Sequence, residues 1–355
     1  MRQPRPGAVS ELARWLKVVL FGVGAMGSRI ARFLLEREGV RIVGAVDVAP
    51  DKVGRDLGEV LGLGRKLGVS VSNDADKVLS KTKPDIVVHA TSSFLRDVYA
   101  QLEEIVGHGV SVVSTCEELT YPFLSEPRLA RALDALAKRR GVAVLGTGIN
   151  PGFLMDTLAI TLTGACQDVR RIMVSRRIDA ATRRLPFQKK IGAGLTVEEF
   201  NKQVERKIIA GHVGLEQSIG MIAASLGWKL DKIAVDPVQP VVAERPVGSA
   251  EIKVMAGGVA GTRQRAYGVM SGLNVITLDF QAYLGAEEEY DSITIEGTPN
   301  IFQRISPCVH GDLGTVALVA NSIPKVINAS PGLVTMNMLP IPSAALGNIA
   351  NRSID

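Results

Sequence analysis

The pattern of apolar and polar positions divides this chain into two regions of different character. From Lys17 to Leu145, short runs rich in β-branched residues alternate with stretches of helical period. Such alternation indicates βαβ units, so we expect a parallel sheet with helices on both faces and ligands at the carboxyl ends of its strands. The predicted strands cover residues 17–21, 41–46, 85–91, 110–115 and 142–146.

After Pro151 the pattern changes to helices followed by long runs of strand character, which predict an α+β domain with an antiparallel or mixed sheet. A last helix, from about Asp312 to Asn328, is expected to be interrupted at Pro324 and to pack back against the first domain. We therefore expect a first domain over residues 1–150, a second over 151–309, and a returning segment over 310–355. Within the second domain, the pattern predicts a helix over 153–165, a strand over 169–179 and helices to about Leu226. Long runs of strand character follow through Ile295, for example at 264–272, 274–285 and 291–297, with a hairpin connection at 255–261.

The end of the first predicted strand carries the sequence GVGAMG, in which Gly22, Gly24 and Gly27 precede a helical stretch. This spacing allows a tight turn, close approach of the backbone to a pyrophosphate, and close packing of helix on strand. Asp47 ends the next strand about 20 residues after Gly27, where an acid commonly binds the hydroxyls of an adenosine ribose. The first domain is thus predicted to bind a dinucleotide. Asp47 favours NAD over NADP, although Lys52 and Arg55 follow closely and could reach a phosphate.

Composition narrows the class of protein further. The chain has 355 residues, 46% hydrophobic and 22% charged, which is a globular balance, and no apolar run reaches about 18 residues, so no membrane span is predicted. The first 17 residues have no apolar core of a secretory signal and are interpreted as a short extension. Three widely spaced cysteines, without a CxxC pair, favour the cytoplasm and argue against structural zinc. The net charge of +5 is modest and scattered, so nucleic-acid binding is not indicated.

Polar residues follow two further strand ends. Thr91, Ser92 and Ser93 come where a strand gives way to a helix; there they could contact the ribose and nicotinamide of a cofactor, or simply cap the helix. Glu117 and Glu118 follow the next strand, and two carboxylates at the end of an apolar strand are costly to bury unless a cation meets them. Surface glutamates are the alternative interpretation.

The segment GTGINPGF closes the first domain with a tight turn at Asn150-Pro151. The Asn150 amide can both donate and accept hydrogen bonds, but a glycine-rich turn at a domain junction needs no ligand, and both interpretations stay open. The arginine pairs near 170, 176 and 183 could clamp a substrate carboxylate, although charged residues on a strand are more often solvated. His310 could approach the site, or could cap the helix that follows it.

The segments GVGAMG, STCEELTYP, GTGINPGF and HGDLGTVALVANSIPKVINASPGLVTMNMLP together resemble the 2,4-diaminopentanoate dehydrogenase family, whose members include NAD(P)-dependent amine dehydrogenases. The resemblance extends over nearly the whole chain after residue 17. Dihydrodipicolinate reductase belongs to the same clan and shares the architecture and a late Gly-Asp-x-x-Thr helix. Its double-histidine, lysine and SGTA segment has no counterpart around the four histidines of this chain, which makes that assignment a poor fit.

The resemblance implies reversible oxidative deamination of an amine by NAD(P)+ and water to a ketone and ammonia, in a homodimer. A carboxylate beside the nicotinamide would attract the cationic substrate and accept a proton, which points to Glu117 or Glu118. In a strand the two face opposite sides, and alternation places Glu118 on the face of Ser114 and Cys116, which favours Glu118. The alternatives are another oxidoreductase of the clan, acting on a cyclic imine or a hydroxy acid, and a non-enzymatic sensor of NAD(H).

The predicted site contains no metal. Its catalytic residues are Glu118 or Glu117, and its substrate residues are Asn150, Pro151 and Phe153. The predicted cofactor residues, for NAD or NADP, are Gly22, Gly24, Ala25, Met26, Gly27, Asp47, Thr91, Ser92, Ser93, Thr115, Cys116 and Asn150.

Overall fold

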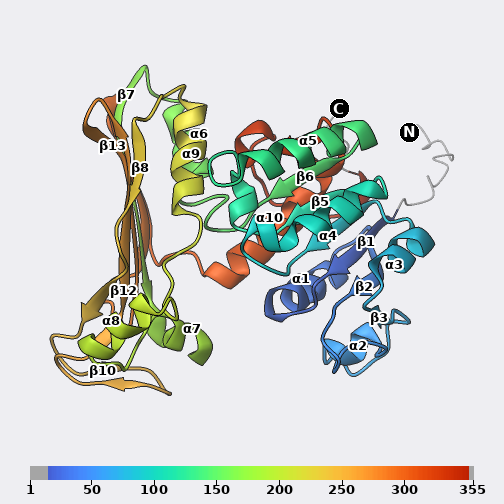
Figure 1. Cartoon of the computed structure of the whole chain (residues 1–355), viewed down its shortest axis with the longest axis horizontal. Coiled ribbons are helices and arrows are strands. Elements are labelled where there is room, and N and C mark those ends of the chain that lie inside the picture. The colour runs from blue at the N-terminus through green and yellow to red at the C-terminus, as the bar shows by residue number, and fades with distance from the viewer. Residues whose placement is uncertain (1–14, 352–355) are drawn as a thin grey trace, which may run out of the picture.

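The computed structural model describes residues 15–351, so most of the expected N-terminal extension lies outside the described residues. Two lobes are arranged side by side, each built on one sheet (Figure 1). The first sheet has the strand order β16-β6-β5-β4-β1-β2-β3 and every neighbouring pair is parallel, which confirms the predicted doubly wound fold. Its strands are β1 (Leu16–Phe21), β2 (Val40–Val46), β3 (Val71–Ser72), β4 (Ile86–His89), β5 (Ser111–Ser114), β6 (Ala143–Gly146) and β16 (Gly332–Val334).

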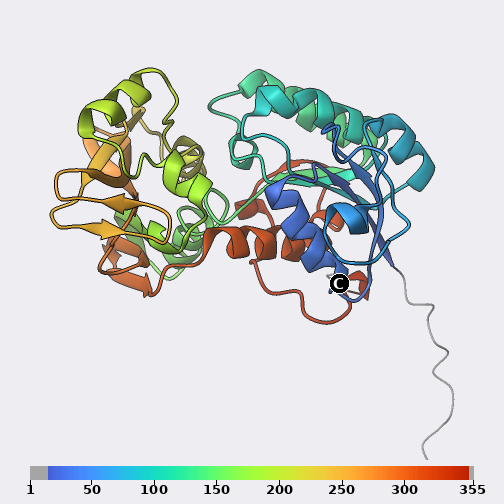
Figure 2. The same ribbon diagram turned by 90° about the horizontal axis from the view of Figure 1, so that it is seen from below.

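Helices cover both faces of this sheet because each presents an apolar stripe to it. In α1, for example, Ile30, Ala31 and Leu34 share one face and are fully buried, as a helical period requires. Helices α1 and α10 pack on one face, and α3, α4 and α5 pack on the other (Figure 2). The helices of this lobe are α1 (Ala25–Leu35), α2 (Leu57–Val60), α3 (Ala75–Thr82), α4 (Leu95–Gly107), α5 (Pro127–Arg140) and α10 (Gly311–Ile327).

The second sheet is mixed, with the order β15-β14-β7-β13-β12-β8, and β9 also pairs with β12. Only β7 and β13 run parallel among these pairs. Helices α6 and α9 lie between this sheet and the first lobe (Figure 1). The strands are β7 (Asp168–Asp179), β8 (Lys232–Val235), β9 (Gln239–Val242), β12 (Val259–Met270), β13 (Leu273–Tyr283), β14 (Tyr290–Thr298) and β15 (Ile301–Ile305), with a separate hairpin of β10 (Val247–Gly248) and β11 (Lys253–Val254). The helices are α6 (Thr157–Thr163), α7 (Leu185–Lys190), α8 (Val197–Glu205) and α9 (Leu215–Ser225).

The structure departs from the predicted elements in several places. Strand β15 lies beyond the predicted limit of the second sheet at Ile295. Strands β3 and β16 were not predicted, since two or three residues are too few to show an alternating pattern. The predicted hairpin connection at 255–261 is wrong, because β12 already begins at Val259 and the strand before it, β11, pairs with β10 rather than with β12. Helix α10 does not break at Pro324, which lies one turn before the helix ends. The side-chain amide of Asn328 donates to the Pro324 carbonyl at 2.7 Å and closes that last turn.

The chain returns to the first lobe after the second sheet. Helix α10 packs on β4, β5 and β6, and β16 then extends the first sheet beside β6. The second lobe is therefore a long insertion between β6 and α10. The two segments that connect the lobes, after β6 and before α10, lie near the carboxyl ends of the strands of the first sheet. In the part of the chain that the structure describes, no helix is long and apolar enough to span a bilayer.

Candidate active site

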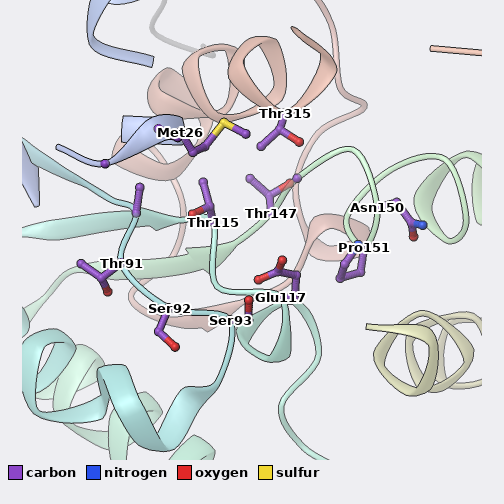
Figure 3. A pocket seen from close by; sticks show the side chains of 14 residues that line it. Met26, Thr91, Ser92, Ser93, Thr115, Glu117, Thr147, Asn150, Pro151 and Thr315 are labelled. Atoms are coloured by element: carbon purple, nitrogen blue, oxygen red, sulfur yellow. The ribbon is translucent and has the colours of Figure 1, made fainter. Parts of the chain in front are cut away.

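A cavity of about 300 Å³ opens beside the turn into α1, at the carboxyl ends of the parallel strands (Figure 3). Ten of the predicted site residues meet there, and four further residues, Ala90, Thr147, Gly148 and Thr315, complete its wall. The predicted residues in the wall are Gly24, Ala25, Met26, Thr91, Ser92, Ser93, Thr115, Glu117, Asn150 and Pro151. The position agrees with the rule that open α/β sheets bind ligands beyond the carboxyl ends of their strands.

The glycine turn has the geometry that close approach of an anion requires. Gly22 has a φ of +94°, and a Cβ atom there would collide with the Ala90 carbonyl. A Cβ on Gly27 would collide with the Gly22 carbonyl, so this glycine lets α1 pack against the turn. Gly24 differs, because a Cβ there would meet open space on the cavity side. Gly24 also precedes α1 without any side-chain cap, which leaves the first backbone N–H groups of the helix available to an anion.

Asp47 lies beside this turn and braces it. Its Oδ2 accepts a hydrogen bond from the backbone N–H of Val23 at 2.8 Å, and its Oδ1 accepts one from Ala49 at 2.9 Å. Burial acts to raise the pKa of Asp47, but these hydrogen bonds and the Lys52 ammonium, 3.1 Å from Oδ2, hold the pKa below its usual value. Asp47 is therefore ionised at neutral pH. The Lys52 ammonium beside it could also bind a phosphate group.

The Thr91–Ser93 segment lines the cavity and rests on a buried histidine. The ring of His89 is hydrogen-bonded to Ser114 at 2.8 Å on one side and to Gln101 and Thr91 on the other. Burial lowers the pKa of His89 to about 4, so the ring is neutral and acts as a fixed polar support. Ser92 donates to Asp97 inside the first turn of α4, at 2.8 Å. The segment therefore lines the cavity, and the capping interpretation is wrong, because the N-cap of α4 is Phe94 and no side chain caps it from that position.

Glu117 lines the cavity, and Glu118 does not. The carboxylate of Glu117 lies beside Ser93 and below Thr115 in Figure 3. Burial raises the pKa of Glu117, and the Ser93 hydroxyl and the Lys190 ammonium offset part of that rise. A partly buried carboxylate with a raised pKa suits both the attraction of a cation and the transfer of a proton near neutral pH.

Glu118 turns the other way and binds a helix end. Its Oε2 accepts a hydrogen bond from the backbone N–H of Leu95, the first residue of α4, at 2.8 Å. The argument that strand alternation places Glu118 with Cys116 fails, because β5 ends at Ser114 and Glu118 begins a 3₁₀ turn. Burial raises the pKa of the Cys116 thiol to about 12, and its Sγ lies 3.3 Å from the Ser93 carbonyl, so Cys116 packs beneath the site without lining it.

The Asn150-Pro151 turn joins the two lobes and forms one end of the cavity. The side-chain amide of Asn150 is turned away from Glu117 (Figure 3) and donates to Met155 Sδ at 3.0 Å. The buried carboxylate of Asp156 fixes the turn by accepting from Gly152 N–H at 2.8 Å and from the Ser218 hydroxyl at 2.7 Å. Phe153, predicted as a substrate residue, faces a different hollow against α10. The backbone and ring of this turn, rather than the Asn150 amide, thus shape the cavity.

Two threonines that were not predicted contribute polar groups. Thr147 follows β6, and its buried Oγ1 has no hydrogen-bond partner within residues 15–351. Thr315 lies in the second turn of α10, and its hydroxyl accepts from the backbone N–H of Ile149 at 3.2 Å. The Gly-Asp-x-x-Thr sequence could have indicated Thr315 as a site residue. However, Thr315 lines this cavity only because α10 packs back on the first sheet.

The arginine pairs and His310 have structural partners. Arg176 is buried and pairs with Asp291, so the expectation of a solvated strand face is wrong for this residue. Arg183 and Arg184 each lie 3.3 Å from Asp312 near the start of α10. His310 is the N-cap of α10, as the alternative interpretation held. None of these residues lines the cavity.

Comparison with known proteins identifies the family. A family model described as 2,4-diaminopentanoate dehydrogenase C-terminal domain matches residues 153–354, and one described as dihydrodipicolinate reductase, N-terminus, matches residues 16–117. The 2,4-diaminopentanoate dehydrogenase of Acetoanaerobium sticklandii is 39% identical to this chain, over 94% of this chain and 96% of the relative. An amine dehydrogenase of Streptomyces virginiae is 24% identical, over 95% of this chain and 99% of the relative.

A solved structure agrees with this relationship. The amine dehydrogenase from Mycobacterium smegmatis superimposes with a TM-score of 0.79 at 33% identity, covering 92% of this chain and 97% of that one. The family and the two-lobed α/β fold that the sequence indicated are therefore confirmed. The chain belongs to the 2,4-diaminopentanoate dehydrogenase family.

Proposed function

We propose that this protein is an NAD(P)-dependent amine dehydrogenase that interconverts an amine and the corresponding ketone. In the deamination direction, R2CH–NH3+ plus NAD(P)+ and water give R2C=O, NH4+, NAD(P)H and one proton. The observation that carries the proposal is that Glu117 shares one cavity with Gly24 and the start of α1. A group that can bind an ammonium thus faces the place where a dinucleotide would lie.

The residues of the turn fit a dinucleotide. The open space beside Gly24 and the uncapped N-terminus of α1 suit a pyrophosphate, and Asp47 suits a ribose. The nicotinamide, when bound, supplies the chemistry by accepting a hydride from the carbon that carries the amine. We propose that NAD is preferred, because the ionised Asp47 would repel a 2′-phosphate, while Lys52 permits some use of NADP.

The chain's own contribution centres on Glu117. Its carboxylate would hold the substrate ammonium, stabilise positive charge as the C–N bond becomes an iminium, and accept a proton from the attacking water. The hydroxyls of Ser93, Thr115 and Thr147 line the same space and could orient that water. Because these hydroxyls and the Glu117 carboxylate can bind further polar groups of a substrate, we propose a polar amine of the 2,4-diaminopentanoate type rather than a simple alkyl amine as the physiological substrate.

A spectrophotometric assay tests the proposal directly. Purified protein should form NADH from NAD+ and 2,4-diaminopentanoate, and should consume NADH with ammonia and the matching ketone. A cyclic imine substrate is the second candidate, but the 4-hydroxy-tetrahydrodipicolinate reductases align over less of this chain than the amine dehydrogenases do: that of Methanocaldococcus jannaschii aligns over 21% of it. Reduction of a cyclic imine without any amine oxidation would overturn the proposal.

We further propose that the protein is a cytoplasmic homodimer formed through the second sheet. Its three cysteines are unpaired, which suits a reducing compartment. Helices α6 and α9 cover one face of the sheet, and in the described residues no helix covers the other (Figure 1). Phe302 is 67% exposed on β15. Sedimentation should give a dimer that Phe302→Glu weakens, and a monomeric wild type would contradict the proposal.

A further inference from the structure

A second, smaller cavity lies on the second lobe beyond the Asn150-Pro151 turn. It has a volume of about 50 Å³, and its wall includes Lys190, His212, Thr262 and Phe280. One water needs roughly 10–15 Å³ by the same measure, so the cavity has room for a few water-sized groups, such as a carboxylate. It is too small for a second ring or a long chain.

The segment that carries His212 connects this cavity to the turn that lines the larger one. Two residues further on, Gly214 packs against the Pro151 ring so closely that a Cβ would collide with it. The His212 ring stacks on Phe280 with the centroids 4.4 Å apart, and the Gln264 amide oxygen accepts from the His212 backbone N–H at 2.8 Å. These contacts hold His212 in the wall of the smaller cavity and Gly214 against the Pro151 ring, which lines the larger cavity.

Lys190 is a charged group in the smaller cavity that also acts on Glu117 in the larger one. It is the last residue of α7, is exposed, and lines the smaller cavity. Its ammonium acts on the ionisation of both Glu117 and His212, so it lies within electrostatic reach of each. Within residues 15–351, Lys190 forms no hydrogen bond or ion pair, whereas Arg183 and Arg184 on the same segment are paired with Asp312.

The smaller cavity also contains an unsatisfied polar atom. His212 Nε2 is buried and has no hydrogen-bond partner within the described residues. A buried polar atom without a partner is destabilising, so a hydrogen-bond donor to Nε2, such as a water that also donates to a bound carboxylate, would be favoured in this cavity. A negatively charged group would also meet the free ammonium of Lys190.

We propose that Lys190 binds the carboxylate of the substrate in this smaller cavity, while Glu117 holds the reacting ammonium in the larger one. The inference rests on the proposed amine dehydrogenase function and deepens it by naming the residue that selects substrates. Opposite charges in two neighbouring cavities recognise an amine that carries a carboxylate a few bonds away. In 2,4-diaminopentanoate, the C4 amine and the C1 carboxylate are separated in this way.

Three amines with the same carbon skeleton test the assignment. 2,4-Diaminopentanoate and 4-aminopentanoate carry the carboxylate, and 2-aminopentane does not. The measured quantity is the ratio of kcat/KM for each carboxylate substrate to kcat/KM for 2-aminopentane, because any common effect of Lys190 on Glu117 cancels in this ratio. A charge-assisted hydrogen bond is worth about 1.5–3 kcal/mol, so we expect Lys190→Met to lower both ratios by roughly tenfold or more, mainly through KM.

Two further variants separate charge from structure. Lys190→Arg should keep most of the preference, because it restores the cation. Lys189→Met removes the neighbouring exposed lysine of the same helix, which does not line the cavity, and should leave both ratios unchanged. A calorimetric titration with 4-aminopentanoate in the presence of NADH gives an independent readout, in which Lys190→Met should weaken binding by a similar factor.

The outcomes distinguish the two proposals. If the wild type oxidises none of the three amines, the amine dehydrogenase function itself fails. If it oxidises them but Lys190→Met leaves both ratios and the calorimetric affinity unchanged, the assignment of Lys190 is overturned. The same conclusion follows if Lys189→Met has an equal effect, or if the wild type prefers 2-aminopentane.

Discussion

The carboxylate of Glu118 accepts a hydrogen bond from the backbone N–H of Leu95 at 2.8 Å and thereby caps α4. Its neighbour in sequence, Glu117, faces the cavity beside the glycine turn. Two adjacent and identical side chains therefore have separate tasks, one at a helix end and one in the site. This separation makes the roles of the two residues testable by matched substitutions.

Glu117→Gln should abolish most activity while cofactor binding persists. Glutamine keeps the shape but cannot carry the negative charge or accept the proton, so we expect kcat to fall by roughly two or more orders of magnitude. The assay is reductive amination at saturating ammonia and ketone, and NADH affinity should stay near that of the wild type. Near-normal turnover would remove Glu117 from the mechanism.

Glu118→Ala is the matched comparison, and its main effect should be on stability. The variant leaves the Leu95 N–H without its acceptor, and loss of a helix cap costs about 1 kcal/mol. Thermal unfolding should show this loss, and Glu118→Gln should show less of it because an amide oxygen can still accept. A larger loss of kcat in Glu118→Gln than in Glu117→Gln would reverse our assignment.

Glu117→Gln should also stabilise the fold at alkaline pH. Burial raises the folded-state pKa of Glu117, so ionisation destabilises the folded protein, and this cost is fully present above the folded pKa. The cost vanishes as pH falls below the unfolded value, near 4.5. Thermal melts should therefore show a higher Tm for the variant than for the wild type at pH 8, and a smaller difference at pH 4. A difference that does not change with pH would show that Glu117 has no raised pKa.

Asp47→Ser should shift the cofactor preference toward NADP. The substitution removes the carboxylate that would repel a 2′-phosphate and releases Lys52, which lies 3.1 Å from Asp47 Oδ2. The ratio of kcat/KM for NADP to that for NAD should rise. The double variant Asp47→Ser/Lys52→Met should lose most of the gain, and an unchanged ratio in the single variant would show that Asp47 does not contact the ribose.

Activity should not depend on a metal ion. Among residues 15–351 the structure brings together no group of three or more histidine, cysteine, aspartate or glutamate side chains that could hold one. Exhaustive dialysis against a chelator should therefore leave kcat unchanged. Loss of activity that zinc or manganese restores would contradict this prediction.

The sequence by itself determined the elements with strong local signals. The run of apolar residues into Gly22-x-Gly24-x-x-Gly27 predicts strand, turn and helix, because only glycine tolerates the φ of +94° at Gly22 and the close contacts around it. Asp47 could be predicted from its position at the end of the following strand. Both features depend on neighbours within one βαβ unit, so local pattern is enough to place them.

Only the tertiary structure decided which polar residues share a cavity. The structure distinguishes Glu117 from Glu118 by a 3₁₀ turn in place of the expected strand. In such a turn successive side chains do not alternate between two faces, so strand alternation cannot predict their directions. Thr315 of α10 lines the cavity, and Lys190 of α7 lies within electrostatic reach of Glu117, because the second lobe is inserted between β6 and α10. Contacts of this kind depend on how separate elements pack, and a one-dimensional pattern holds no record of that packing.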